Sequence, residues 1–119
     1  VFPDSSVTLD YLLAKSTSLL DGLVVYPENM LKNLNATKGL IFSGQLMLQL
    51  TQKGVSREEA YKWTQRNAMK VWDEGGNYSE LVNKDADISS HLTDEEIARV
   101  FDLKHYLRNV ETVFARVFD

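Results

Sequence analysis

The chain has 119 residues, of which 44% are hydrophobic and 25% are charged, a composition typical of a soluble globular protein. A chain of this length suits one domain with a core of its own, because it buries roughly two thirds of its unfolded surface. No apolar run approaches the roughly 20 residues that cross a bilayer, so no membrane partner is expected. The net charge of −4 arises from interspersed acids and bases, which argues against nucleic-acid binding.

Cysteine is absent from the sequence. The chain therefore has no disulfide framework, no thiolate nucleophile and no cysteine zinc site, and a reducing, cytoplasmic location is the default expectation. Its first residues, Val1 to Asp4, lack an initiator methionine and any signal-peptide pattern, so we expect Val1 to be the cut end of a longer protein.

The first predicted element is a long helix from Ser5 to Tyr26, with a polar side chain among Asp4, Ser5 and Ser6 as its N-cap. Its apolar stripe follows spacings of four and three residues. The stripe consists of Leu9, Leu13, Ser16, Leu20 and Leu23. Pro27 predicts a kink or break before helix resumes from Glu28 to Leu34. If both stretches run on, they form a protruding rod of about 40 Å.

A second helix is predicted from Thr37 to Lys53, closed by Gly54 in a left-handed conformation. Ser43 and Gly44 would lie in its middle, where their small side chains would let another backbone come close. No alternating strand pattern competes here or elsewhere in the sequence.

A capping box from Ser56 to Glu59 predicts the start of a third helix, which should end at Gly75 and Gly76. Apolar residues recur at helical spacing along it, and packing in a core is a far more common use of such a stripe than a ligand site. The residues assigned to the core are Ala60, Trp63, Ala68, Val71 and Trp72.

The last third of the chain predicts a short helix from Ser79 to Asn83, a solvated loop from Lys84 to Ser90, and a helix from a second capping box at Thr93–Glu96 to about Phe101. Asp102 should cap a final helix. Its buried stripe would comprise Leu107, Val110, Phe114 and Val117. The fold class is therefore all-α.

One segment imitates a calcium-binding loop, because Asp85, Asp87, Ser89 and Glu96 occupy loop positions one, three, five and twelve. Position six needs glycine for its sharp turn, and Ser90 stands there. Glu96 also has a use in the capping box. We expect no metal site.

Other candidate sites have structural explanations. The spacing of Gly39 and Gly44 resembles a phosphate-binding loop, but Gln45 replaces the lysine that such a loop needs, so helix is expected. His91 and His105 are far apart in sequence and lack a metal-binding pattern. The carboxylate pairs Glu58–Glu59 and Glu95–Glu96 suit first helical turns, where the helix dipole favours negative charge. A catalytic triad assembled in space stays open, although no serine lies in a nucleophile-elbow pattern.

Several segments taken together carry a resemblance that none of them carries alone. They are, besides the long helix, Val1–Ser6, Asn33–Ser43, Gly54–Tyr61, Gln65–Ala68 and His105–Arg108. In this order, and over essentially the whole chain, they resemble the C-terminal end of the adenylosuccinate lyase family, within the fumarase and argininosuccinate lyase superfamily.

The resemblance implies a cofactor-free parent enzyme of purine biosynthesis. Such an enzyme eliminates fumarate from adenylosuccinate, giving AMP, and from the succinyl-carboxamide ribotide earlier in the pathway. The elimination needs a base, an acid and donors for carboxylate charge. In the family, the base is a serine on a mobile loop and the acid is a histidine of the central domain. A Ser-Ser-x-Glu-Arg substrate contact is expected upstream of Val1. No family catalytic, substrate-binding or metal residue maps onto this chain, so the fragment itself should be inactive.

The resemblance also implies a domain organisation. Residues 1–27 would be the last long helix of a central helical bundle, and residues 28–119 the small multi-helix C-terminal domain. The parent would be a homotetramer whose long helices pool into one bundle, and the leucine stripe would be exposed or covered by self-association in an isolated chain. The alternative is a non-catalytic helical interaction module whose amphipathic rod docks into a partner's groove.

Overall fold

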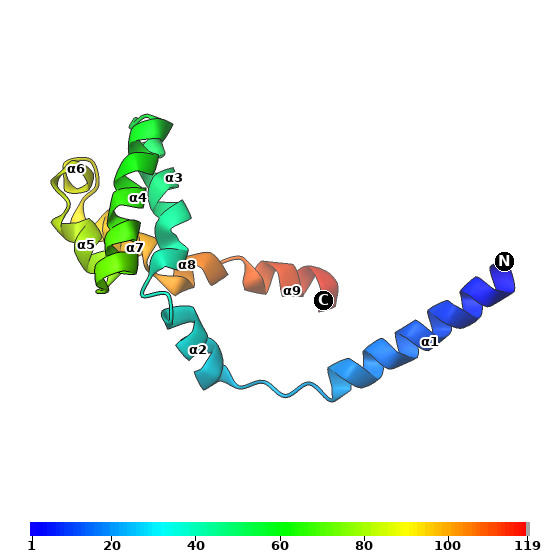
Figure 1. The fold of residues 1–119 in the computed structure, drawn as a ribbon. Coiled ribbons are helices and arrows are strands. Elements are labelled where there is room, and N and C mark those ends of the chain that lie inside the picture. Colours follow the sequence, from blue (N-terminus) through cyan, green and yellow to red (C-terminus); the bar gives the residue numbers. More distant parts are fainter. Residues whose placement is uncertain (119) are drawn as a thin grey trace. The chain divides into compact units, whose positions relative to one another are not determined.

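The computed structural model describes residues 1–118 as helices joined by turns, with no strand in that range (Figure 1). The all-α prediction is confirmed. The elements are α1 (Phe2–Asp21), α2 (Pro27–Asn35), the 3-10 helix η1 (Leu40–Phe42), α3 (Ser43–Gln52), α4 (Arg57–Glu74), α5 (Tyr78–Lys84), α6 (Ala86–Ser89), α7 (Asp94–Val100), α8 (Leu103–Leu107) and α9 (Val110–Phe118). No helix of the described chain is long and apolar enough to span a membrane.

The chain divides into two compact units. The first comprises Val1–Leu31, and the second begins at Lys32. The first unit contains α1 and the start of α2, and the second contains the remaining helices. The two are described separately below.

Helix α1 is long, as predicted, but its two ends were predicted wrongly. It begins at Phe2 with Val1 as N-cap and no side-chain cap. The hydroxyls of Ser5 and Ser6 instead donate to carbonyls four residues back in the same helix. The helix ends at Asp21, with Gly22 as its C-cap, rather than at Tyr26. Glycine has low helix propensity, and the residue before a proline is disfavoured in helical conformation, which together account for the early stop.

The two predicted helical stretches do not run on into one rod. Residues 23–26 have no helical structure, and Pro27 is the first residue of α2 instead of a kink within a helix. This place suits proline, because the first amide of a helix has no intrahelical partner in any case. Helix α1 alone, at 20 residues, is about 30 Å long.

A single apolar core holds the second unit together, where α3 packs against α4 and α7, and α5 against α4, α6 and α7. Its buried members are Leu46, Leu50, Val55, Ala60, Val71, Tyr78, Val82, Ile88, Leu92, Ile97 and Val100. Phe101 meets both Phe42 and Tyr78 edge-on, with ring centroids 5.5 and 5.9 Å apart. Such contacts position the three aromatic rings as well as burying them.

The predicted helix from Thr37 to Lys53 starts late. Lys38 and Gly39 have φ angles of 52° and 93°, which no helix accommodates, and η1 then leads into α3. Gly44 has no atom within 4 Å of where a Cβ would lie, so the predicted close approach there is wrong. The close approach is at Gly39, whose Cβ would lie 3.4 Å from that of Tyr78. Gly54, at φ 91°, follows α3 in the left-handed region as predicted.

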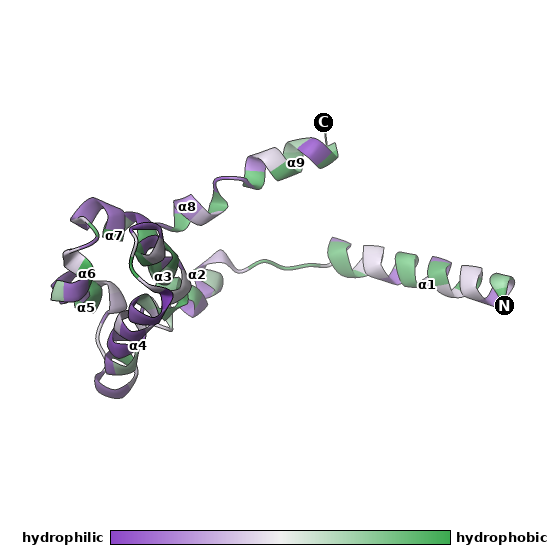
Figure 2. Ribbon diagram, turned by 90° about the horizontal axis from the view of Figure 1, so that it is seen from above, coloured by the Kyte–Doolittle hydropathy of each residue, from purple (hydrophilic) through white to green (hydrophobic). Residues whose placement is uncertain are grey.

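Helix α4 has the predicted ends. Ser56 Oγ accepts a hydrogen bond from the amide of Glu59 at 3.2 Å, but the Glu59 carboxylate bonds the Ser56 hydroxyl rather than its amide, so only half of the capping box forms. Helix α4 stops before Gly75. In Figure 2 this helix is largely hydrophilic, which agrees with a single buried stripe facing α3 and α5.

The buried stripe of α4 differs from the predicted one at a single aromatic residue. Ala60 and Val71 are buried, and Trp63 and Ala68 pack partly against the core. Trp72, however, is 77% exposed, so its assignment to the core is wrong. Successive residues point about 100° apart on a helix, and the inward positions beside Ala60 and Val71 belong to Thr64 and Asn67, which are 6% and 2% exposed.

The segment from Lys84 to Ser90 is not the solvated loop that was predicted. Asp85 accepts a hydrogen bond from the amide of Asp87 and caps the short helix α6, whose Ile88 is fully buried. The capping box at Thr93 is confirmed, with the amides of Glu96 and Thr93 donating reciprocally at 3.3 and 3.1 Å.

The final helix is broken into α8 and α9 between Leu107 and Val110. Asp102 caps α8 as predicted, accepting from the amide of Lys104 at 2.9 Å. The predicted burial of its apolar stripe is wrong within this chain. Its exposed fractions are 54% at Leu107, 40% at Val110, 56% at Phe114 and 69% at Val117. Neither α8 nor α9 contains a buried residue.

Candidate functional site

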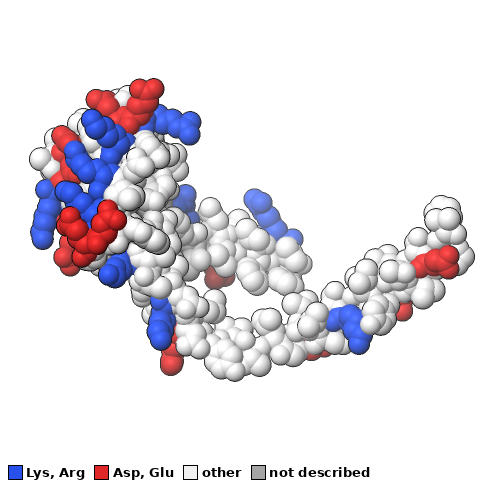
Figure 3. Space-filling view, viewed as in Figure 1, with Lys and Arg blue, Asp and Glu red and all other residues white. Residues whose placement is uncertain are grey.

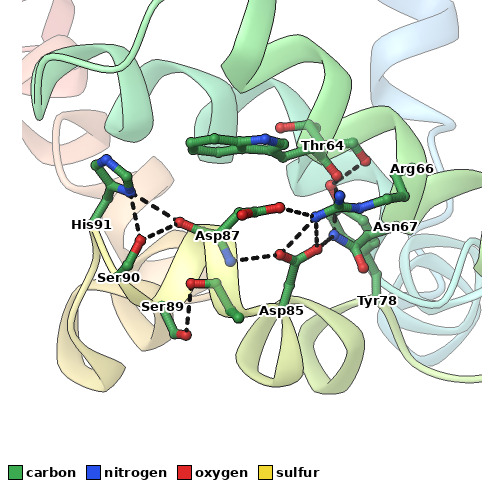
Figure 4. A network of polar contacts seen from close by, with 11 residues as sticks. Thr64, Arg66, Asn67, Tyr78, Asp85, Asp87, Ser89, Ser90 and His91 are labelled. Atoms are coloured by element: carbon green, nitrogen blue, oxygen red, sulfur yellow. Dashed lines mark hydrogen bonds and ion pairs between the residues drawn. The ribbon is translucent and has the colours of Figure 1, made fainter.

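The densest polar cluster of the described chain joins α4 to the start of α6 (Figure 4). The Arg66 guanidinium donates to both carboxylate oxygens of Asp85, at 2.8 and 2.7 Å, and to Asp87 at 2.8 Å. Asn67 donates its amide to Asp85 at 2.6 Å. Arg66 and Asn67 are neighbours on α4. Asp85 is the N-cap of α6 and Asp87 lies in its first turn, so the cluster ties these two helices together.

Asp85 is the centre of this cluster and is well shielded, with a side chain that is 6% exposed. Burial alone would disfavour its charged form, but the hydrogen bonds from Asn67 and Arg66, together with the positive charge of Arg66, outweigh burial and hold the pKa of Asp85 below its ordinary value. Hydrogen bonds to the carboxylates of Asp85 and Asp87 raise the pKa of Arg66. Asp85 is therefore an anion that accepts hydrogen bonds and is poorly suited to abstract a proton.

Tyr78 lies beside the cluster and is fully buried. Its hydroxyl donates to the carbonyl oxygen of Thr64 at 3.1 Å. Burial raises the pKa of Tyr78 far above its ordinary value, so the phenol stays protonated and anchors α5 to α4. The Thr64 hydroxyl is buried without a hydrogen-bond partner within residues 1–118.

The two histidines lie in different surroundings. The His91 ring lies against Trp63, with centroids 5.3 Å apart, and its Nδ1 is within hydrogen-bond distance of the Ser90 hydroxyl and the Asp87 carbonyl. His105 Nε2 accepts from Arg108 at 2.6 Å. The first histidine follows α6 and the second lies on α8, and each is engaged locally.

The acidic residues at the spacing of a calcium-binding loop do not come together around one point. Asp85 and Asp87 are held by Arg66, whereas Glu96 binds Lys53 at 2.6 Å and the Thr93 amide. Over residues 1–118 no group of three acidic, histidine or cysteine side chains converges as a metal site would require. The carboxylates of Glu58, Glu59, Glu95 and Glu96 lie in the first turns of α4 and α7, as expected.

The Arg66–Asp85 cluster was not found by sequence reasoning. Asn67 offered one signal, because a polar residue at the inward position of an amphipathic helix needs a buried partner. That partner, Asp85, lies 18 residues away, and nothing in the local pattern identifies it. With every charged group satisfied, the arrangement suits structural support better than proton transfer.

Comparison with known proteins relates most of the chain to one family. Residues 39–117 match the family described as adenylosuccinate lyase C-terminus. The adenylosuccinate lyase of Synechocystis sp. is 41% identical over 117 residues, and that of Thermotoga maritima is 39% identical over 116 residues. An adenylosuccinate lyase of Helicobacter pylori is 41% identical over 128 aligned positions.

In each comparison the match covers 98% of this chain, but only 27% of the Synechocystis and Thermotoga proteins and 29% of the Helicobacter protein. The chain thus spans less than a third of the curated relatives it matches. It belongs to the adenylosuccinate lyase family and corresponds to the C-terminal part of its members.

Proposed function

We propose that this chain is the C-terminal part of an enzyme that eliminates fumarate from adenylosuccinate, giving AMP, and from the succinyl-carboxamide ribotide. The observation that carries the proposal is the match of 98% of the chain to adenylosuccinate lyases from three organisms. The parent works without a cofactor in the cytoplasm. The chain contributes helices to it and does not perform the reaction alone.

The inactivity of the isolated chain is supported by the state of its ionisable groups. An elimination of this kind needs a base near the carbon-bound proton and an acid near the departing nitrogen. The Asp85 carboxylate, with its lowered pKa, is occupied by Arg66 and Asn67. Tyr78 is buried and bonded to a carbonyl. The ring nitrogens of the two histidines contact polar groups of their own segments.

The domain assignment is part of the same proposal. Residues 1–27 belong to the last long helix of a central bundle, and residues 28–119 form the C-terminal domain. Helix α1 supports this, because none of its residues is buried. Exposed fractions along its leucine stripe are 57% at Leu9, 60% at Leu13, 70% at Leu20 and 66% at Leu23. Such a row of exposed leucines marks an interaction surface, and in the parent homotetramer it is covered by helices of other subunits.

The direct test is an assay of fumarate release from adenylosuccinate. The isolated chain is expected to show no turnover above the buffer rate, whereas the longer natural protein that contains it should produce fumarate and AMP in equal amounts. Turnover by the isolated chain would contradict its role as a non-catalytic part. Failure of the longer protein to release fumarate would contradict the assignment of the reaction.

A second candidate is a non-catalytic module whose α1 docks in the groove of a different protein. The exposed leucines of α1 favour it as much as they favour a bundle. The natural coding sequence distinguishes the two candidates, because a lyase continues upstream of Val1 into the catalytic segments and a module does not.

A further inference from the structure

A small hollow on the surface of the second unit has a lining that the lyase assignment does not use. It lies where α3, α7 and α8 meet and has a volume of about 150 Å³. Its lining residues are Gln45, Gln49, Glu96, Arg99, Val100 and His105. Only Val100 among them is an apolar residue, and the others bring polar or charged groups from three helices to the hollow.

Three of the lining side chains are hydrogen-bond donors without a protein partner. Gln45 and Gln49 are half-buried and lie one helical turn apart on the same face of α3. Within residues 1–118 their side-chain amides make no hydrogen bond, and the Arg99 guanidinium makes neither a hydrogen bond nor an ion pair. The three side chains line the same hollow and are open to water, so their donors are free to bind a ligand that supplies acceptors.

The one acidic residue of the lining does not turn the hollow into a cation site. Glu96 Oε1 is 2.6 Å from Lys53 Nζ, and its Oε2 accepts from the Thr93 amide at 3.1 Å. The ion pair with Lys53, followed by the hydrogen bond from Thr93, lowers the pKa of Glu96. Both oxygens of this carboxylate are therefore occupied, and its charge is matched by that of Lys53.

The histidine of the lining adds positive charge indirectly. His105 Nε2 accepts from the Arg108 guanidinium at 2.6 Å, and the same guanidinium donates to the His105 carbonyl at 2.8 Å. Within residues 1–118, Glu96 is paired with Lys53, whereas neither Arg99 of the lining nor Arg108 beside His105 forms an ion pair. In Figure 3 Lys and Arg side chains are interspersed with Asp and Glu side chains on the upper left part of the molecule, which belongs to this unit.

We propose that this hollow binds a small oxyanion, a carboxylate or a phosphate, whose oxygens accept from the Arg99 guanidinium and from the amides of Gln45 and Gln49. A guanidinium presents paired donors that match either anion in bidentate geometry. The volume equals about five times the 30 Å³ that one water occupies in the liquid, enough for a phosphate or a carboxylate of a few carbons. This site is independent of the lyase chemistry and lies wholly within the second unit.

The test is a titration of the ¹⁵N-labelled chain with sodium phosphate, followed through the side-chain amide signals of Gln45 and Gln49 by NMR, with ionic strength held constant by sodium chloride. Parallel titrations with acetate and succinate distinguish phosphate from carboxylate selectivity. Saturable shifts of both signals with at least one of the three anions are expected. No saturable shift with any of them would overturn the proposal.

Two variants make the outcome specific. Arg99→Gln should weaken the binding about tenfold, because it removes a charge-assisted hydrogen bond. Arg57→Gln, which removes another exposed arginine on α4 outside the hollow, should leave it unchanged. Gln49→Leu should remove one donor without changing the net charge, and it provides a second reading if Arg99→Gln disturbs the fold. If the unsubstituted chain, Arg99→Gln and Gln49→Leu all bind the anion equally well, the signal reports an adventitious ion only, and the proposed site is contradicted.

Discussion

At the scale of single residues, Asp85 shows most clearly where local sequence reasoning stops. Its spacing from Asp87 and Glu96 suggested a loop, yet its partners Arg66 and Asn67 come from α4. The rejection of calcium binding rested on Ser90 and on the capping role of Glu96, and that role is confirmed. The ion pair itself could not be predicted, because it depends on how α6 packs against α4.

Replacement of this carboxylate by an amide should destabilise the fold. We expect Asp85→Asn to lower the free energy of unfolding by about 2 kcal/mol near neutral pH, since hydrogen bonds to a charged group are lost while Arg66 keeps part of its exposure to water. Urea denaturation followed by tryptophan fluorescence measures this change. Asp73→Asn, at an exposed position of α4 without an ion pair in the described chain, is the matched control and should have little effect.

The pH dependence of this contribution has a definite sign. The pKa of Asp85 is lower in the folded chain than its ordinary value, so the unfolded chain binds the proton first and folding becomes less favourable as pH falls. The contribution is complete above about pH 4, near the ordinary pKa of aspartate, and is lost as pH falls through the folded pKa. Asp85→Asn should flatten the acid limb of the stability curve; an equally steep limb would contradict the role given to this carboxylate.

Trp72 tests the corrected core. Because this side chain is 77% exposed, Trp72→Ala should change the free energy of unfolding of the isolated chain by less than about 0.5 kcal/mol. Leu46→Ala, at a fully buried position, should cost about 2–5 kcal/mol. Thermal unfolding followed by circular dichroism at 222 nm compares the two variants, and a larger loss for Trp72→Ala would reverse the assignment.

At the scale of elements, the ends of helices that depend on local chemistry were predicted well. The capping box at Thr93, the stop at Gly75 and the left-handed Gly54 each involve a few neighbouring residues. The start of α3 was not predicted, because Lys38 has a positive φ that its residue type does not suggest. The Lys38 carbonyl accepts from the Tyr78 amide at 3.0 Å, so a contact distant in sequence accompanies this conformation.

The cap of α7 gives a prediction at this scale. Thr93→Ala removes the acceptor for the Glu96 amide and should lower the free energy of unfolding by about 1 kcal/mol. Thr112→Ala, at an exposed threonine of α9 that is not an N-cap residue, changes the same residue type without removing a cap and serves as control. Chemical denaturation of both variants measures the difference, and equal stability of the two would show that the cap contributes nothing.

At the scale of the whole molecule, the all-α class and the family followed from the sequence, because periodicity and a series of motifs extend over nearly its full length. Burial at the two ends could not be predicted in the same way. The apolar stripes of α1 and of α8–α9 have helical spacing, but neither element has a buried residue. Periodicity identifies the face of a helix that needs a partner, and it does not say whether the same chain supplies that partner.

The proposed self-association follows from this observation. Most of the visible surface of α1 carries no charged side chain (Figure 3), and its leucines are more than half exposed. Burying apolar surface of this kind releases about 25 cal/mol for each Å² removed from water. A row of four leucines on several chains can therefore support association, provided that the copies meet through the same face.

Sedimentation velocity of the isolated chain tests the central claim, that the leucine face of α1 is an interface between copies, most directly. The chain should sediment as an assembly larger than a monomer at micromolar concentration, and the double variant Leu13→Glu, Leu20→Glu should sediment as a monomer. Ser18→Glu, at an exposed position about 140° around α1 from Leu13, should assemble like the unsubstituted chain. The account would be contradicted if the unsubstituted chain stayed monomeric at every concentration, or if the double variant assembled as well as the unsubstituted chain.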